Sequence, residues 1–271
     1  MMRQNLHTHT TWDDGRNTAR EMVEAALGAG MTAVGISVHS PTGEADGWSL
    51  PAHRLPDYRR EMAALAREYA GRIRVYCGVE WDVTSRIELA PYDYVIGSVH
   101  YLPIEGHPTV DESEAVTARF LSEVFHGDAD AAAAMYFDEL LRVAREPEVD
   151  IVGHFDLLTK FDERRHFFNP DSPVYRKSAE RAMEALVAAG KIFEVNTGAI
   201  SRGYRRTPYP SRALLTRLRE MGGRVTVSAD AHAASGIACA FDAAEALLRD
   251  CGFREIYALG DGGFAPAALE G

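Results

Sequence analysis

The chain has 271 residues, of which 46% are hydrophobic and 25% are charged, and its net charge at pH 7 is -11. This composition is ordinary for a soluble globular protein with a sizeable core. The acidic balance argues against broad binding to nucleic acid or to an anionic membrane, because both require a basic surface. It leaves room for a small anionic substrate, since bound metal ions can reverse the local charge.

The start of the chain and its cysteines suggest a cellular compartment. The opening segment MMRQNLHTHT lacks the apolar core of a signal peptide, and no stretch approaches the roughly 18 apolar residues of a membrane-spanning helix. The three cysteines show no CxxC spacing, so a disulfide framework is not expected. We therefore expect a cytoplasmic protein with reduced thiols.

Short apolar runs alternate with helical patterns along the chain. The apolar runs are expected to be strands, and they lie at residues 5–7, 32–39, 72–82, 92–101, 150–156, 191–198 and 224–232. The helical patterns lie at 17–30, 55–71, 178–190 and 211–223. Asn17 or Thr18 is the expected cap of the first helix. Strands that alternate with helices in this way predict a parallel sheet with helical crossovers.

One connection is longer than the others. The segment at about 102–144 is expected to be a helical insertion, with helices near 117–125 and 131–146. No linker-like composition interrupts the chain, so residues 1–271 are expected to form a single domain. The tail after Tyr257 is expected to hold a turn and a short terminal element.

Metal-ligand side chains recur at the carboxyl ends of the expected strands. Six of the seven strands end in such residues, which are His7 and His9, His39, Glu80, His100, His154, and Asp230 and His232. A lone histidine at a strand end is more often structural than a ligand. The recurrence carries the argument, because parallel strands of a barrel place all their carboxyl ends on one face.

The residue types suit a borderline divalent metal. Imidazole and carboxylate bind zinc, manganese and iron without a thiolate. The two histidines of the HxH segment can act together, because alternate residues of a strand point to the same side. With Asp14, nine candidate ligands are too many for one ion, and they suffice for three ions if a carboxylate bridges two of them.

Several motifs together resemble the PHP (polymerase and histidinol phosphatase) family. They are the HxH segment with a following Asp-Gly, the strand-end His39, and the segments GVE, IGSVHY, GHFD and SADAH. The segments IGSVHY, IVGHFDLLTKF and EVNTGAISRG are similar to the histidinol-phosphate phosphatase branch of that family. The resemblance spans His7 to His232. It implies a distorted (β/α)7 barrel of the TIM-like kind that binds three divalent ions.

The resemblance also implies a role for each candidate ligand. The first ion would be held by His7, His9, Glu80 and Asp230, the second by Glu80, His100 and His154, and the third by Asp14, His39 and His232. Glu80 would thus bridge two ions, and Glu80 and Asp230 are the expected catalytic residues. The chain departs from the family pattern at two positions: Asp13 stands where this branch often has serine, and Val38 stands where the family often has aspartate.

Two basic residues are candidates to bind a phosphate group beside the ions. Lys160 follows the fifth strand and Arg202 follows the sixth. Three divalent ions with three carboxylate ligands would leave an electropositive pocket, which suits a phosphate monoester dianion. The acidic loop after His39 offers Glu44 or Asp46 as a partner for an amine on the substrate.

The function expected from the resemblance is metal-dependent hydrolysis of L-histidinol phosphate in histidine biosynthesis. The partner would be a small phosphate ester, with no nucleic acid and no membrane. One alternative is another phosphoesterase of the same family. A second is deamination of the amidohydrolase type, which is disfavoured because the expected fourth strand ends in His100. A third is a catalytically silent metal-binding module, which is disfavoured because such modules lose several ligands.

Overall fold

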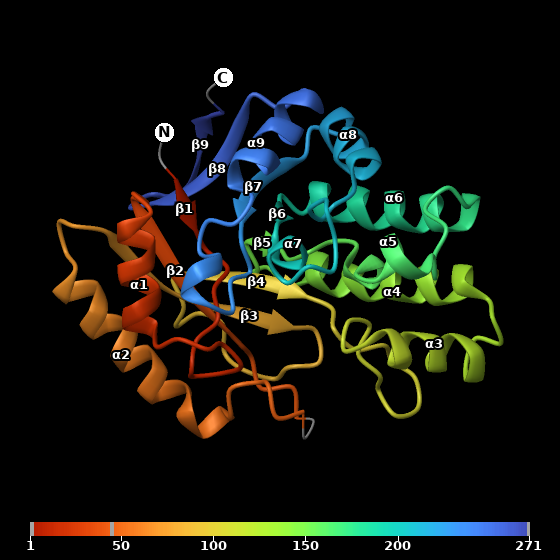
Figure 1. Cartoon of the computed structure of the whole chain (residues 1–271), viewed down its shortest axis with the longest axis horizontal. Coiled ribbons are helices and arrows are strands. Elements are labelled where there is room, and N and C mark those ends of the chain that lie inside the picture. The colour runs from red at the N-terminus through yellow and green to blue at the C-terminus, as the bar shows by residue number, and fades with distance from the viewer. Residues whose placement is uncertain (1–2, 44–45, 270–271) are drawn as a thin grey trace.

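The computed structural model describes residues 3–43 and 46–269, which form a nearly closed barrel of parallel strands (Figure 1). The strands follow one another in chain order around a seven-stranded sheet. They are β1 (Gln4–Asn5), β2 (Ala33–His39), β3 (Arg74–Asp82), β4 (Tyr94–Ser98), β5 (Ile151–Val152), β6 (Ile192–Asn196) and β7 (Arg224–Ser228). A parallel bridge between Thr8 and Ala231 joins the two edges of the sheet. The expected distorted (β/α)7 barrel is confirmed.

Helices surround the barrel and fill the connections between strands. Those that correspond to expected helices are α1 (Ala19–Gly28), α2 (Leu55–Glu68), α3 (Glu114–Glu123), α4 (Ala129–Arg145), α6 (Pro173–Ala188) and α8 (Arg212–Glu220). Figure 1 shows α1 and α2 on one side of the barrel, with α3, α4 and α6 on the opposite side. No described helix is long and apolar enough to cross a membrane.

Thr18, and not Asn17, is the N-cap of α1. Its hydroxyl accepts from the Glu21 N–H, and the Glu21 carboxylate accepts from the Thr18 N–H, which is a capping box. Asn17 has a different role, since its side-chain oxygen accepts from the Ala234 N–H at 2.9 Å. It thereby ties the start of α1 to the loop after β7.

The described part of the chain contains more helical elements than the sequence indicated. Short elements that were not expected are α5 (Asp162–Arg165), α7 (Gly198–Ser201), and the 3-10 turns η1 (Ala52–Arg54), η2 (Leu157–Thr159) and η3 (Ala234–Gly236). The helix α9 (Phe241–Asp250) was also not expected. The expected turn and short terminal element after Tyr257 are present. They belong to an antiparallel hairpin of β8 (Glu255–Gly260), a strand that was not expected, and β9 (Gly263–Ala268). Its two-residue loop is Asp-Gly, a sequence favoured in tight hairpins.

The hairpin packs against the amino end of the barrel. Its Leu259 belongs to a small buried cluster inside the barrel whose other buried members are Leu6, Tyr94, Ile96, Ile151 and Ile192. These side chains come from five different strands or their ends. The amino end of the barrel is therefore filled with apolar side chains, and the polar groups gather at the other end.

Two glycines make room for the largest side chain of this cluster. The ring of Tyr94 lies over Gly35 of β2 and Gly78 of β3. A Cβ atom at Gly35 would lie 2.2 Å from the Tyr94 hydroxyl, and one at Gly78 would lie 2.2 Å from the ring carbon that bears it. The hydroxyl itself donates to the Leu6 carbonyl. Tyr94 thus links β4 to the chain that leads into the HxH segment.

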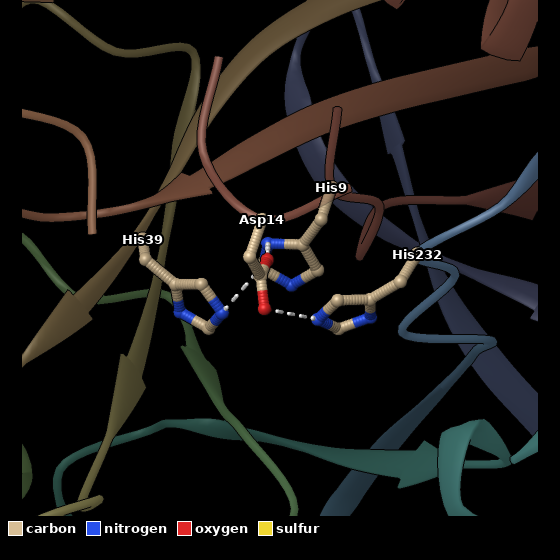
Figure 2. A group of neighbouring side chains, drawn as sticks. All are labelled: His9, Asp14, His39 and His232. Carbon is tan, nitrogen blue, oxygen red and sulfur yellow. Dashed lines mark ion pairs between the residues drawn. The ribbon is translucent and has the colours of Figure 1, made fainter. Parts of the chain in front are cut away.

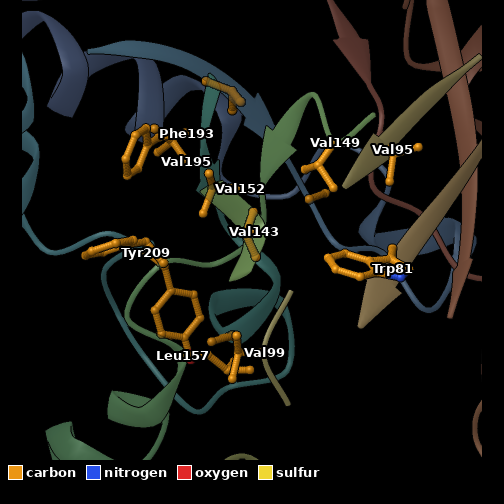
Figure 3. Close-up of a cluster of buried hydrophobic side chains, with 14 of the residues drawn as sticks. Trp81, Val95, Val99, Val143, Val149, Val152, Leu157, Phe193, Val195 and Tyr209 are labelled. Atoms are coloured by element: carbon orange, nitrogen blue, oxygen red, sulfur yellow. The ribbon is translucent and has the colours of Figure 1, made fainter. Parts of the chain in front are cut away.

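The main core lies between the barrel and the outer helices (Figure 3). Val143 of α4 and Val149, which precedes β5, lie close over the backbone of β4 at Gly97. A Cβ atom at Gly97 would lie 2.7 Å from Val143 and 2.9 Å from Val149. This close approach fixes α4 against the sheet, and with it the long segment between β4 and β5.

Substituting Gly78 with alanine should test how tightly Tyr94 is packed. The added methyl group collides with the ring, and overpacking of this kind costs about 1–3 kcal/mol, or roughly 2–10 °C in Tm. Gly28→Ala is the matched control, because no atom lies within 4 Å of its added Cβ. Thermal unfolding should show an unchanged or higher Tm for Gly28→Ala. An unchanged Tm for Gly78→Ala would contradict the tight packing.

Candidate metal centre

The nine candidate ligands meet at the carboxyl ends of the strands. They are His7, His9, Asp14, His39, Glu80, His100, His154, Asp230 and His232. Their potential ligand atoms fall into four overlapping groups, and within each group all atoms lie within 4.8 Å of one another. Residues that are spread over most of the chain are thus neighbours in space.

The first strand ends before the HxH segment, which is held in place by the end of β7. The His9 N–H donates to the Ala231 carbonyl at 2.9 Å, and the Ala231 N–H donates to the His7 carbonyl at 3.1 Å. Thr8 donates its hydroxyl to a backbone carbonyl of β2 at 2.7 Å. Both imidazoles are fully buried as a result.

Glu80 lies among five imidazoles, and its side chain has no exposed surface. Its Oε1 lies 2.9 Å from His154 Nε2 and 3.5 Å from His100 Nε2. Its Oε2 lies near three further nitrogens, at 2.8 Å from His39 Nδ1, 3.2 Å from His7 Nε2 and 3.5 Å from His9 Nε2. One carboxylate oxygen therefore faces each side of the cluster, which is the arrangement a bridging ligand needs.

Asp14 is the most exposed of the candidate ligands, with a side chain that is 33% exposed. Figure 2 shows it between His39 and His232. Its two oxygens lie 3.6 Å from His39 Nε2 and 3.2 Å from His232 Nε2. The ring of His9 stacks on His39 with 4.1 Å between ring centroids, and on His232 with 4.2 Å. These four side chains surround one point and come from three separate parts of the chain.

Asp230 lies beside both histidines of the HxH segment. Its Oδ1 lies 3.4 Å from His9 Nε2 and 3.7 Å from His7 Nε2. Its backbone has a φ of 46°, in the left-handed region that aspartate tolerates better than most residues. This conformation occurs at the sharp turn between β7 and His232, and such strained positions are frequent at functional sites.

The donor set fits divalent metal ions. Several buried ligand atoms have no hydrogen-bond partner among the described residues, and these are His7 Nε2, His9 Nε2, His39 Nδ1 and Glu80 Oε2. Buried polar atoms of this kind are costly unless something compensates them. A cation bound by nitrogen and oxygen would satisfy all four, and imidazole with carboxylate is a usual set for zinc, manganese or iron.

The local electrostatics agree with this fit. Burial lowers the pKa of His9, but the carboxylates of Asp13 and Asp230 raise it to about 10. Burial raises the pKa of Glu80, yet the surrounding imidazoles, with His7 first among them, hold it well below its usual range. The carboxylates thus stay ionised and attract cations. Protons and divalent ions compete for the same imidazole nitrogens.

Arg202 and Lys160 both line the cavity beside the cluster, but their surroundings differ. Arg202 donates to Asp230 Oδ2 at 3.0 Å and to His232 Nδ1 at 2.8 Å. Lys160 donates to the Asp111 carbonyl at 2.7 Å and to Asp111 Oδ2 at 3.0 Å. Arg202 is therefore next to the ligand cluster, whereas the charge of Lys160 is offset by Asp111.

The cavity in front of the cluster has a volume of about 790 Å³. Its wall away from the candidate ligands includes Trp48, Tyr101, Asp111, Glu112, Arg119 and Tyr204. Trp48 and Tyr101 stack on each other with 5.9 Å between ring centroids. The wall thus combines aromatic surface with charged groups, and much of it comes from the segment between β4 and β5.

The acidic loop after His39 does not present Asp46 as a free carboxylate. Asp46 Oδ1 accepts from Trp48 and Ser49, and its Oδ2 accepts from Thr42 and Tyr101. The carboxylate organises the loop, so it is a poor partner for a substrate amine. The other candidate of this loop, Glu44, lies outside the described residues.

Three further buried carboxylates lie behind the imidazoles: Asp13, Asp82 and Glu194. Each accepts from a histidine Nδ1. Asp82 could have been found from the sequence, because it lies two residues after Glu80 on β3 and so faces the same side. Glu194 of β6 points into the barrel, where it is fully buried.

A parallel barrel with imidazoles and carboxylates at the carboxyl ends of its strands defines a metal-dependent barrel enzyme, because such enzymes build their sites on this face. Comparison with known protein families gives a more specific result. The model of the PHP domain matches residues 5–198. The chain belongs to the PHP domain family.

Individual relatives extend the match over nearly the whole chain. A protein of Deinococcus radiodurans named "Probable histidinol-phosphatase" is 30% identical over 264 residues, or 92% of this chain and 94% of that protein. A solved structure from Listeria monocytogenes has a TM-score of 0.78 at 18% identity, and it covers 89% of this chain and 99% of its own.

A second solved structure is histidinol phosphate phosphatase from Lactococcus lactis, complexed with Zn, L-histidinol and phosphate. It has a TM-score of 0.74 at 21% identity, with 97% of this chain and 99% of that chain covered. At such identities the two solved structures bear on the fold alone, and both agree with the distorted barrel.

Adding divalent metal should stabilise the protein. A ligand at a hundred times its Kd stabilises the folded state by about 2.7 kcal/mol, or roughly 5–10 °C in Tm for a chain of this size. Chelator-treated protein should show this rise when Mn²⁺ is added, and Glu80→Gln should lose most of it. Asp150→Asn is the control, since its carboxylate accepts from the Val95 N–H at the amino end of the sheet. An equal rise in Glu80→Gln would argue against Glu80 as a ligand.

Proposed function

We propose that this protein is a histidinol-phosphatase, which hydrolyses L-histidinol phosphate to L-histidinol and phosphate. The observation that carries the proposal is the convergence of nine ligand-type side chains around Glu80 in a barrel of the PHP family. The name of the Deinococcus radiodurans relative and the histidinol and phosphate bound in the Lactococcus lactis structure support the choice of substrate. The reaction would belong to histidine biosynthesis, and we place it in the cytoplasm.

We further propose that three divalent ions occupy the site, and the zinc in the Lactococcus lactis structure supports zinc as one of them. Manganese and iron suit the same ligands. The ligand sets would be His7, His9, Glu80 and Asp230 for the first ion, Glu80, His100 and His154 for the second, and Asp14, His39 and His232 for the third. Bound ions of this kind supply Lewis acidity, which stabilises charge on phosphoryl oxygens and makes water more acidic.

The side chains of the protein would position the ester and transfer a proton from the attacking water to the leaving group. Arg202 lies beside Asp230 and would bind a phosphoryl oxygen, while it keeps the Asp230 carboxylate in place. In hydrolysis, the oxygen of a water molecule bonds to phosphorus and the bond from phosphorus to the ester oxygen breaks. One proton of that water must reach the leaving oxygen of histidinol. Asp230 is the group that we propose carries it.

The charge balance differs from the expectation based on the sequence. Asp13, Asp82 and Glu194 add three carboxylates to those of the ligand set. Six carboxylates would then offset the six positive charges of three divalent ions, so the loaded cluster would not itself be strongly electropositive. Arg202 adds a positive charge at the cavity and favours a phosphate dianion there.

Asp111 is our candidate for recognising the cationic end of the substrate. It lines the cavity from the segment between β4 and β5, which we propose is an insertion on the barrel. Burial raises its pKa, but Lys160 and His100 lower it to about 2, so the carboxylate stays ionised. Lys160 fixes its orientation. An ionised carboxylate next to aromatic surface suits an ammonium or imidazole group.

Substrate comparison tests the proposed function directly. We expect kcat/KM for L-histidinol phosphate to exceed that for an aryl phosphate by at least about a hundredfold, because groups built to pair with the substrate reject an analogue that leaves them unpaired. Phosphate release by protein loaded with Zn²⁺ or Mn²⁺ measures both. Equal values would remove the histidinol-phosphate assignment and leave a general phosphoesterase of the same family.

The Asp111→Asn substitution should separate recognition of the amine from recognition of phosphate. Loss of a charged hydrogen bond costs about 1.5–3 kcal/mol, so kcat/KM for L-histidinol phosphate should fall about 10–100-fold with little change for an aryl phosphate. Glu112→Gln, at the neighbouring residue of the cavity wall, is the matched control. Arg202→Ala should lower kcat/KM for both esters by a similar factor. A similar loss for both esters in Asp111→Asn would contradict the proposed role.

A further inference from the structure

Three buried carboxylates that are not candidate ligands hold the imidazoles from behind. The His7 Nδ1 lies 2.5 Å from Glu194, the His9 Nδ1 lies 2.7 Å from Asp13, and the His100 Nδ1 lies 3.1 Å from Asp82. An ionised carboxylate can only accept a hydrogen bond, so each Nδ1 carries the proton. The Nε2 lone pair of each ring is then directed toward the centre of the cluster.

Each of the three carboxylates also accepts from a backbone N–H of a candidate ligand. Glu194 accepts from the His154 N–H at 2.8 Å, and Asp13 accepts from the His39 N–H at 3.0 Å. Asp82 accepts from the N–H of His100, the residue whose ring it also holds, at 2.9 Å. Two of the carboxylates therefore join ligands from different strands, and the third serves a single ligand.

The joined ligands belong to different ions in the proposed assignment. Asp13 connects His9 of the first ion with His39 of the third. Glu194 connects His7 of the first ion with His154 of the second. Asp82 acts on the second ion alone, through His100. The three carboxylates thus differ in which ions they can influence.

Further hydrogen bonds fix the orientation of the two connecting carboxylates. Asp13 also accepts from the Thr10 N–H at 2.9 Å. Glu194 also accepts from Asn196 Nδ2 at 2.9 Å and from the Ser228 hydroxyl. Both side chains are fully buried and have little freedom to relax. Removing the charge of either one would release an imidazole and a strand end together.

We propose that Asp13 and Glu194 are positioning residues that couple the ions: Asp13 couples the first to the third, and Glu194 couples the first to the second. The proposal rests on the three-ion site given above and not on the identity of the substrate. Outer hydrogen-bond partners of metal ligands contribute about 10–100-fold to metal affinity. We expect this effect at two ions for each connecting carboxylate and at one ion for Asp82.

The test compares Asp13→Asn, Glu194→Gln and Asp82→Asn with the unmodified protein, without substrate. Metal content, affinity by chelator competition, and anomalous diffraction at each position are measured with Mn²⁺ or Zn²⁺. Asp13→Asn should lower the affinity for the ions at His9 and His39 about 10–100-fold and leave the affinity for the ion at His100 and His154 unchanged.

The other variants should give different patterns. Glu194→Gln should lower the affinity for the ions at His7 and His154 and leave the affinity for the ion at Asp14 and His232 unchanged. Asp82→Asn should lower the affinity only for the ion at His100. Asp150→Asn, which removes a carboxylate from the amino end of the sheet, should change no metal position. An equal loss at all positions, or no loss at any of them, would overturn the proposal.

A second measurement keeps the proposal falsifiable if a variant fails to fold. In the unmodified metal-loaded protein, ¹⁵N NMR shifts of the imidazoles should show a protonated Nδ1 in His7, His9 and His100. An unprotonated Nδ1 in His7 or His9 would remove the basis of the coupling. Because neither experiment uses substrate, failure to hydrolyse L-histidinol phosphate would overturn the proposed function and leave this inference standing.

Discussion

The burial of the Glu80 charge is the constraint on which the rest of the site depends. A carboxylate without exposed surface costs several kcal/mol unless positive charge compensates it. The barrel provides that compensation by placing imidazoles from several strands at one end, and the apolar side chains at the other end keep water out. The bridge between Thr8 and Ala231 completes the arrangement, because it brings the HxH segment beside Asp230.

Much of this arrangement could be predicted because the relevant strands have strong sequence patterns. His39 and Glu80 are cross-strand partners on β2 and β3, which are the two longest strands of the barrel and lie in apolar runs. The fifth strand is much shorter than its apolar run, and both the first and the fifth strands end before the chain reaches His7 or His154. The ligands there lie on irregular extensions, which a strand pattern does not distinguish from the strand itself.

The missed elements lacked the signals on which sequence analysis relies. The helix α9 follows Ala240, which has a left-handed conformation and makes no capping hydrogen bond, so no start signal precedes it. Ion pairs between residues that are far apart in the sequence are equally hard to predict. Lys160 and Asp111 are 49 positions apart, and only the fold shows that the lysine holds the aspartate. Similarly, only the fold shows that Asp13 contacts two candidate ligands, His9 and His39.

The attachment of Asp111 to Lys160 has a consequence for how such an enzyme can evolve. Most candidate ligands of the cluster lie at or just after the strand ends, whereas much of the cavity wall comes from the segment between β4 and β5. This segment is tied to the rest of the chain through ion pairs, among them Asp111–Lys160 and Glu114–Arg165, and through the packing of α4. If Asp111 has the proposed role, mutations in this segment would change which molecule is accepted and leave the candidate metal ligands intact. Under that proposal, chemistry and selectivity would be inherited through separate parts of one chain.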